Sequence, residues 1–270
     1  MRRAVGPAPP RAAQGPRDPA DGGGSTLIEI QGLSKKYGGR YAVRDLDLHV
    51  RKGELFGFLG PNGAGKTTTM RMLAGSMRPT SGSIKVAGVD MLRDPITAKS
   101  HLGYIPDRPY LYDKLTGREF LRFVGRFYRV PPEVLERRAE SYIELFDLEE
   151  AAGRLIETYS HGMKQKLVLA SALLHDPECL IVDEPMVGLD PKGARQLKAL
   201  FRDLVDRGCT VFMSTHSLDV AEHVCDRAGI IFDGRLLAVD TVDRLRGDQS
   251  LEEAFLRLTD PEAAELARAL

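Results

Sequence analysis

The sequence of 270 residues has little cysteine and no net charge. Its three cysteines, Cys179, Cys209 and Cys225, are scattered and lack C-x-x-C spacing, which argues against a disulfide framework and against a zinc site. We expect free, buried thiols in a reduced cytosol. Lys and Arg total 38, as do Asp and Glu, so the chain has no global basic field. We therefore expect no nucleic-acid partner.

The sequence also lacks a long apolar run, an internal repeat and sustained heptads. Its longest apolar runs, such as residues 167–174, fall far short of the roughly 18 residues that a membrane-spanning helix needs. No similarity recurs at a solenoid period, and no heptad pattern indicates a coiled coil. A hydrophobic content of 43% is ordinary for a globular protein. The chain is long enough for one large domain or two small ones.

Residues 1–25 are rich in Pro, Gly, Ala and Arg and contain almost no large apolar side chains. Such a segment cannot bury enough surface to offset the entropy of ordering, so we expect a disordered tail. No apolar stretch follows Arg2 and Arg3, which argues against an export signal. A start codon assigned upstream of the true domain would explain this tail at least as well as a function of its own.

The most informative segment of the chain is residues 60–67, which fit the pattern G-x-x-x-x-G-K-[ST]. Its glycines permit a turn whose backbone N–H groups converge on one polyanion. Lys66 would reach the β- and γ-phosphates of a nucleotide, and the Thr67 hydroxyl would bind Mg²⁺. A buried strand (54–59) precedes the turn, and a helix (66–73) closed by Gly75 follows it. The context therefore predicts a site for a nucleoside triphosphate.

A second apolar strand, residues 180–182, ends in two carboxylates. Asp183 suits Mg²⁺ held jointly with Thr67, and Glu184 is placed to act on an attacking water. Two adjacent carboxylates repel each other and favour a nearby cation.

The rest of the chain indicates an α/β fold. Residues 27–50 and 83–89 alternate as antiparallel strands, and residues from about 94 to 160 read as helices, with a capping box formed by Thr116 and Glu119. Alternating strands and helices then imply a mostly parallel P-loop NTPase sheet with an inserted helical subdomain. We expect a core domain at 26–240, its helical subdomain at about 94–165, and a helical extension at 241–270. Asp190 is the expected N-cap of one core helix.

In this order of motifs the chain resembles the ATP-binding subunit of ABC transporters, from about residue 27 to residue 240. Ser160-His161-Gly162-Met163 is similar to the signature motif and Gly188-Leu189-Asp190 to the D-loop. The resemblance implies an ATPase with ATP and Mg as cofactors. It assigns catalytic roles to Lys66, Glu184 and His216, and metal binding to Thr67, Asp107 and Asp183. The implied nucleotide-binding residues are Tyr37, Gly60, Pro61, Asn62, Gly63, Ala64, Gly65, Lys66, Thr67, Thr68, Asp107, Ser160, Gly162 and Asp190.

The chain departs from the family pattern in two places. Asp107 stands where the family has Gln, which adds negative charge and shortens the side chain. His161 and Met163 replace Gly and Gln in the signature motif. His161 removes a small residue from that backbone but offers an imidazole to the γ-phosphate. The resulting motif, Tyr-Ser-His-Gly-Met, looks like variants of the signature motif in exporter-class ATP-binding subunits.

The resemblance implies a pair of ATP-binding subunits, homodimeric or formed with a related subunit, that sandwich two ATP molecules. It also implies a polytopic permease partner and a cytoplasmic location, peripheral on the inner face of the membrane. The large side chains Tyr110, Leu111, Tyr112 and Phe120 are expected to touch that partner. The alternative is a soluble ABC-type mechanoenzyme acting on ribosomes or DNA. A P-loop kinase or GTPase does not explain Ser160-His161-Gly162 together with His216.

Overall fold

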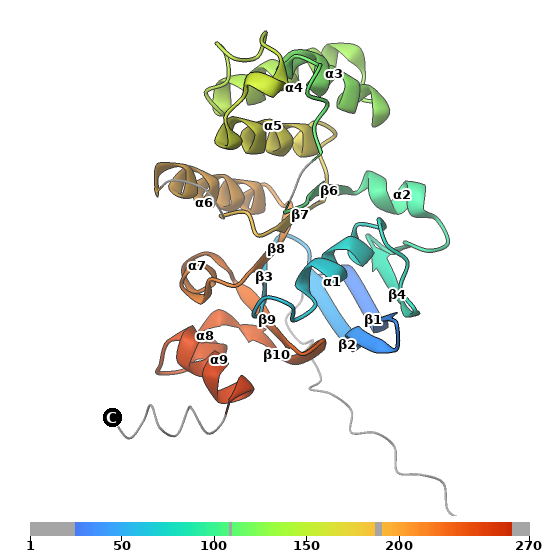
Figure 1. Cartoon of the computed structure of the whole chain (residues 1–270), viewed down its shortest axis with the longest axis vertical. Helices are drawn as coiled ribbons and strands as arrows, with labels where there is room; N and C mark the ends of the chain where they lie inside the picture. Colours follow the sequence, from blue (N-terminus) through green and yellow to red (C-terminus); the bar gives the residue numbers. More distant parts are fainter. Residues whose placement is uncertain (1–24, 108–109, 187–190, 261–270) are drawn as a thin grey trace, which may run out of the picture.

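The computed structural model describes residues 25–107, 110–186 and 191–260. Strands in these ranges form two sheets, and a group of helices lies beyond one end of the larger sheet (Figure 1). This arrangement is the α/β fold with an antiparallel N-terminal layer that the sequence predicts.

The smaller sheet has four antiparallel strands in the order β2-β1-β4-β5. These strands are β1 (Thr26–Tyr37), β2 (Arg40–Arg51), β4 (Ser81–Val86) and β5 (Val89–Asp90). Gly38 and Gly39 make the turn between β1 and β2 with φ of 48° and 92°, a region that glycine adopts without steric cost.

The larger sheet has six strands in the order β10-β9-β3-β8-β7-β6. These are β3 (Leu55–Leu59), β6 (Leu102–Ile105), β7 (Cys179–Asp183), β8 (Thr210–Thr215), β9 (Arg227–Phe232) and β10 (Arg235–Thr241). All neighbours are parallel except β10, which pairs antiparallel with β9. Every residue of β3, β7 and β8 is buried, as expected for parallel strands covered on both faces. Their carboxyl ends meet at one edge of the sheet.

Two clusters of buried apolar side chains pack against this sheet. On β3, Phe56 and Phe58 join the cluster shared with the smaller sheet and α1 (Lys66–Leu73), whereas Leu55 and Leu59 join the cluster beneath the other helices. The alternation follows from the period of two along a strand. Phe56 also stacks on Phe212 of β8, with ring centroids 5.5 Å apart. Burial on both faces thus fixes the strand that leads into the P-loop.

The remaining helices around the sheets are short except for one. They are α2 (Pro95–Ser100), α6 (Pro191–Asp206), α7 (Leu218–Val224), α8 (Val242–Arg246) and α9 (Leu251–Thr259). Helix α9 packs on α7 and α8, so the helices of the C-terminal extension lie against the core. Asp190, the expected N-cap of α6, lies outside the described residues.

A helical block is formed by α3 (Gly117–Phe127), α4 (Pro132–Leu145) and α5 (His161–Leu173), with the short 3-10 turn η1 (Ile156–Thr158) before α5 (Figure 1). The predicted capping box of Thr116 and Glu119 is present at the start of α3. The expectation of helices from about residue 94 was wrong for Leu102–Ile105, which is strand β6 beside β7. Four residues are too few for periodicity to distinguish a buried strand from a helix.

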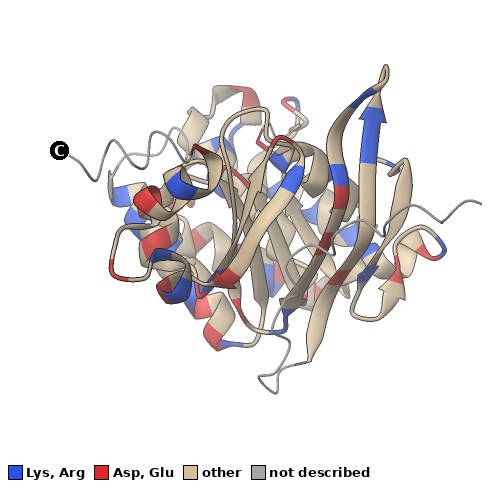
Figure 2. Ribbon diagram, turned by 90° about the horizontal axis from the view of Figure 1, so that it is seen from below, with Lys and Arg blue, Asp and Glu red and all other residues tan. Residues whose placement is uncertain are grey.

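Charged side chains of both signs are interspersed along the helices (Figure 2). This distribution agrees with the balance of 38 basic and 38 acidic residues. Within the described ranges, no helix combines the length and the apolar character that crossing a bilayer requires.

Candidate nucleotide site

The P-loop, residues 60–67, connects β3 to α1 through a turn that only glycine can form. Gly65 precedes α1 with a φ of 109°, and a Cβ there would lie 2.4 Å from the Ala42 carbonyl oxygen. Gly63 has a φ of 83°, and a Cβ there would meet no atom within 4 Å. Gly65 is therefore required by packing, whereas Gly63 leaves open space over the loop. That combination suits backbone N–H groups that face a phosphate.

Lys66 lies at the first position of α1 and its side chain is 6% exposed. Its ammonium group donates to the carbonyl oxygen of Gly60 at 2.6 Å and to that of Pro61 at 3.2 Å. It also lies 3.3 Å from Oε1 of Glu184, which follows β7. The P-loop lysine and the predicted catalytic carboxylate, separated by more than a hundred residues, thus share one site.

Glu184 is held in an unusual backbone conformation. Its φ is 53°, in the left-handed region that residues other than Gly, Asn and Asp rarely adopt. Its Oε2 lies 2.9 Å from Nδ1 of His216 and accepts from the His216 backbone N–H at 3.4 Å. Of the three residues predicted as catalytic, Glu184 therefore contacts both of the others, Lys66 and His216.

Asp183 lies beside this group with its carboxyl buried at the end of β7. Burial raises the pKa of Asp183, and the negative charges of Glu184 and Asp107 act in the same direction. The Ser214 and Thr67 hydroxyls oppose this shift in the pKa by favouring the charged form. Its Oδ2 is buried and has no hydrogen-bond partner among the described residues. An orphaned carboxylate oxygen next to a hydroxyl fits Mg²⁺, which prefers oxygen ligands.

Thr67 and Asp183 would hold that Mg²⁺, as the sequence predicts. The described residues contain no group of three His, Cys, Asp or Glu side chains arranged around a metal. Mg²⁺ commonly takes only one or two protein ligands and completes its shell with phosphate oxygens and water. The donors present therefore suit Mg²⁺ together with a nucleotide better than a resident structural metal.

Ser214, near the end of β8, is a site residue to which the sequence reasoning gave no role. Its hydroxyl donates to Oδ1 of Asp183 at 2.5 Å and accepts from the Glu184 N–H at 3.1 Å. The pairing of Asp183 with Ser214 across β7 and β8 creates both contacts. Its place two residues before His216 was the only signal in the sequence.

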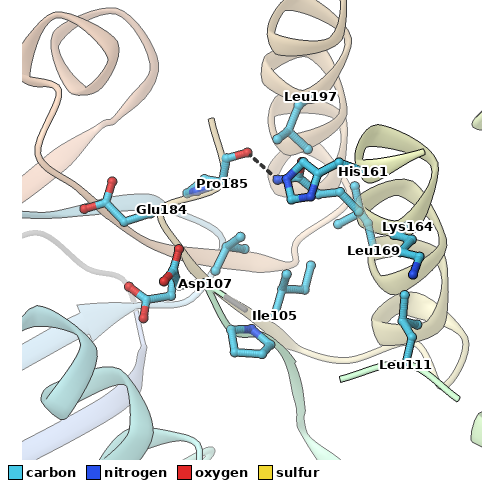
Figure 3. Close-up of a pocket in the computed structure, with 13 residues that line it drawn as sticks. Ile105, Asp107, Leu111, His161, Lys164, Leu169, Glu184, Pro185 and Leu197 are labelled. Carbon is cyan, nitrogen blue, oxygen red and sulfur yellow. Dashed lines mark hydrogen bonds between the residues drawn. The ribbon is translucent and has the colours of Figure 1, made fainter. Parts of the chain in front are cut away.

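Asp107 follows β6 and is exposed at the mouth of a cavity of about 410 Å³. Figure 3 shows its carboxylate on the same side of the cavity as Glu184, while His161 and Lys164 line the opposite side. Burial is the main cause of the raised pKa of Asp183, and the negative charge of Asp107 adds a smaller contribution in the same direction. The structure thus places Asp107 near the predicted metal ligands, and its own binding to metal stays a prediction.

Tyr37 ends β1 on the surface and is 48% exposed. Its hydroxyl donates to the sulfur of Met77 at 2.9 Å, and the Lys35 ammonium lies 5.3 Å from its ring centroid. An anchored ring that remains half exposed is suited to stacking on a base. The predicted contact with adenine remains a prediction.

The signature residues are not brought to the chain's own P-loop. Ser160 caps α5 by accepting from the Met163 N–H at 3.3 Å, and Gly162 lies in the first turn of that helix. No hydrogen bond or ion pair among the described residues joins Ser160 or Gly162 to residues 60–67. A Cβ on Gly162 would meet no atom within 4 Å, so this glycine is not required by packing within the chain. The D-loop residues, Asp190 included, lie outside the described ranges.

A family model described as "ABC transporter" matches residues 43–187, more than half of the chain. The chain belongs to the ABC transporter family. This membership confirms the predicted family and, at the level of the family, the expected ATPase class with ATP and Mg as cofactors.

Curated relatives of this ABC domain include proteins named for drug resistance. The chain is 39% identical to the daunorubicin/doxorubicin resistance ATP-binding protein DrrA of Streptomyces peucetius, over 90% of this chain and 74% of that protein. It is also 39% identical to the bacitracin transport ATP-binding protein BcrA of Bacillus licheniformis, over 82% of this chain and 72% of that protein. A match of 37% identity to the probable multidrug ABC transporter ATP-binding protein YbhF of Escherichia coli covers 87% of this chain but only 42% of that relative's length.

Solved structures confirm the fold of the ABC domain. A structure described as the ATP binding subunit of an ABC transporter shares 34% identity with a TM-score of 0.81, over 86% of this chain and 99% of that one. A dimeric cassette bound to ADP and Pi, MJ0796, has a TM-score of 0.74 at 24% identity, over 80% and 99% of the two chains, a likeness in fold alone.

Proposed function

We propose that this ABC domain is the ATP-binding and hydrolysing subunit that drives a membrane transporter, an exporter by the names of its relatives. One observation carries the proposal: Glu184 contacts both Lys66 of the P-loop and His216 after β8. A purely structural ion pair would explain why Lys66 and Glu184 are in contact. It would not explain why a buried carboxylate oxygen of Asp183, beside them, has no hydrogen-bond partner among the described residues.

Each site residue has a distinct task in this mechanism. Lys66 and the N-terminal end of α1 bind the β- and γ-phosphates. Glu184 orients a water in line with the γ-phosphorus and accepts its proton as the water oxygen bonds to phosphorus. The bond from phosphorus to the bridging oxygen breaks, which releases ADP and inorganic phosphate. His216 holds the Glu184 carboxylate and faces the γ-phosphate. Thr67 and Asp183 would hold Mg²⁺, which would neutralise charge on the transferring phosphoryl group.

The signature residues serve a second ATP-binding subunit. Because Gly162 faces open space and Ser160 is not linked to its own P-loop, these residues are free to approach a partner's nucleotide. Two chains, or this chain and a related subunit, would close head to tail around two ATP molecules. Preferential binding of ATP to the closed pair drives the transport cycle. The partner that this movement acts on would be a polytopic permease, which places the subunit on the inner face of the membrane.

The outer face of α3 is the proposed contact with the permease. Four aromatic side chains on or just before α3 are 46–83% exposed: Tyr110, Tyr112, Phe123 and Phe127. Phe123 and Phe127 line a shallow hollow of about 460 Å³ together with Glu119, Arg122 and Arg126. Two residues expected on this surface belong elsewhere, because Leu111 and Phe120 are 9% and 5% exposed and pack in the core. A local run of large side chains does not reveal which of them point inward.

The proposal is tested by Mg²⁺-dependent phosphate release with two variants. Lys66→Ala should lose ATP binding, because the ammonium is the main cation inside the P-loop. Glu184→Gln should bind ATP but turn over about 100-fold or more slowly, since the amide is a poor proton acceptor. With turnover blocked, Glu184→Gln and ATP should sediment as a dimer.

Asp248→Asn, which changes an exposed carboxylate to an amide, is the control for Glu184→Gln. A rate for Glu184→Gln equal to that of the wild type would refute the water-activating role. Full hydrolysis by a strictly monomeric species would refute the head-to-tail pair.

A further inference from the structure

Gln165 lies on α5 and reaches across to the residue after Glu184. Its Nε2 donates to the Pro185 carbonyl oxygen at 3.0 Å, drawn as a dashed line at Pro185 in Figure 3. Only the NH2 half of the amide can donate to a carbonyl, so this contact fixes the orientation of the side chain. The bond joins the helix that begins at the signature motif to the loop that carries Glu184.

The backbone at Glu184 needs such a restraint. A glutamate with a φ of 53° is in a conformation that costs free energy and persists only where the surroundings impose it. On the upstream side, the Glu184 N–H is fixed by Ser214 at 3.1 Å. On the downstream side, Pro185 has no N–H to donate, so its carbonyl is the group by which the peptide can be held. Ser214 and Gln165 therefore hold the backbone on both sides of Glu184.

The environment of Gln165 argues against a purely structural role. With Leu169 and Leu197, it lines both the cavity beside Glu184 and a second cavity of about 420 Å³ between α4, α5 and α6. Its Oε1 is buried without a hydrogen-bond partner among the described residues. An amide that is half satisfied among leucines costs stability compared with an apolar residue of similar size. The hydrogen bond that the Gln165 side chain does make is the one to the Pro185 carbonyl oxygen.

We propose that Gln165 is a positioning residue for Glu184: its hydrogen bond to Pro185 keeps the Glu184 carboxylate aimed at the attacking water. The inference rests on the proposed catalytic role of Glu184.

The test is Gln165→Leu, which keeps the volume and loses the donor. We expect kcat to fall about 10- to 100-fold, the range for a misaligned catalytic group, while the Kd for ATP stays within about twofold. The thermal midpoint should change little, because removal of the orphaned amide oxygen offsets the donor that the buried Pro185 carbonyl loses. Gln196→Leu is the matched control, since it makes the same change on α6 in the lining of the same second cavity.

Gln165→Glu adds a readout that a merely structural role would not move. A carboxylate cannot donate to the Pro185 carbonyl, but a protonated carboxyl can. The ratio of its kcat to that of the wild type should therefore rise as the pH falls. A wild-type kcat for Gln165→Leu, or equal losses of kcat, ATP affinity and stability, would overturn the proposal. If Glu184→Gln instead turned over normally, the proposed function itself would fail, so the two failures are distinguishable.

Discussion

Asp183 illustrates how a single residue can be unfavourable for folding and still be needed for chemistry. Its carboxyl is buried beside Glu184, one oxygen is hydrogen-bonded to Ser214, and the other has no partner among the described residues. Burial and the neighbouring charges raise its pKa, which means that the native state resists the ionised form. A divalent cation relieves both the charge repulsion and the missing contact.

Asp183→Asn should accordingly stabilise the protein in Mg²⁺-free buffer and abolish Mg²⁺-dependent hydrolysis. A carboxyl with a raised native pKa binds its proton more tightly in the native state than in the unfolded state. Its ionisation therefore lowers stability as the pH rises through the native pKa. The amide removes that loss while its oxygen still accepts from Ser214. At pH 7 we expect the thermal midpoint to rise by about 2–4 °C, corresponding to about 1 kcal/mol.

Scanning calorimetry from about pH 4, near the ordinary pKa of 3.8 for this carboxyl, to pH 8 measures this effect. Asp248→Asn is again the exposed control and should leave the profile unchanged. A lower midpoint for Asp183→Asn across the whole range would show that burial of the carboxylate is not costly.

At the scale of elements, the helical block is fastened to the larger sheet around His175, just after α5. Its ring stacks on Tyr128 at the end of α3, with centroids 3.8 Å apart and planes 9° apart. Its Nε2 lies 2.9 Å from the Leu102 carbonyl oxygen at the start of β6 and must be the protonated nitrogen. Its Nδ1 is buried without a partner among the described residues. One imidazole thus joins α3, α5 and β6.

This joint should weaken in acid. Burial lowers the pKa of His175; Asp176 opposes that change in the pKa, and the Arg138 charge adds to it. With a depressed native pKa, the unfolded state takes up the proton first, so stability should fall as the pH drops below about 6.5. His175→Phe keeps the stacking and cannot titrate. It should unfold at lower urea overall, because Leu102 loses its donor, but with a flatter dependence on pH between about 6.5 and 5.

Urea unfolding at several pH values checks this expectation, with His223→Phe on the exposed face of α7 as the control. Parallel slopes for the wild type and His175→Phe would mean that another group carries the acid sensitivity.

The sequence predicted those parts of the site that depend on the order of elements. A P-loop after β3, a carboxylate after β7 and a histidine after β8 must meet, because adjacent parallel strands end at one edge. It did not predict the double contact of Ser214 or the reach of Gln165 to Pro185, because these depend on strand register and on the packing of α5 against the core. Likewise, the pattern that marked Leu111 as exposed could not show that it packs inward.

At the scale of the whole molecule, exposed aromatic side chains gather on and before α3. The edge-to-face contacts of Tyr112 with Tyr110 and Phe123 hold these rings together while leaving them accessible. In the view of Figure 2, Lys and Arg are interspersed with Asp and Glu along the helices. This patch, close to Asp107 in the chain, suits an apolar protein partner that responds to nucleotide.

Tyr110→Asp should release the protein from membranes that contain its permease while ATP binding persists. Tyr110 is 83% exposed, so the change does not disturb the core, whereas a partner pressed on it would face a buried unpaired charge. Cell fractionation and a nucleotide-binding assay separate the two effects. Ile96→Asp on α2, where the side chain is 82% exposed, is the matched control.

Leu111→Asp should instead destabilise the protein, since Leu111 belongs to the core. Membrane association that survives Tyr110→Asp would place the contact elsewhere. A wild-type protein that stays off membranes and co-purifies with ribosomes or DNA would support the mechanoenzyme alternative.

The low reactivity of the three native thiols makes it possible to follow movements of the protein with labels on introduced cysteines. Cys179 and Cys225 are buried and Cys209 is half-buried, and burial raises the pKa of all three, that of Cys209 to about 11. At neutral pH almost no thiolate is available to attack a maleimide. A cysteine introduced at position 96 or 248, where the side chain is exposed, would therefore take a fluorophore or spin label in the otherwise native chain. Distances between two labelled subunits could then be followed through a cycle of ATP hydrolysis.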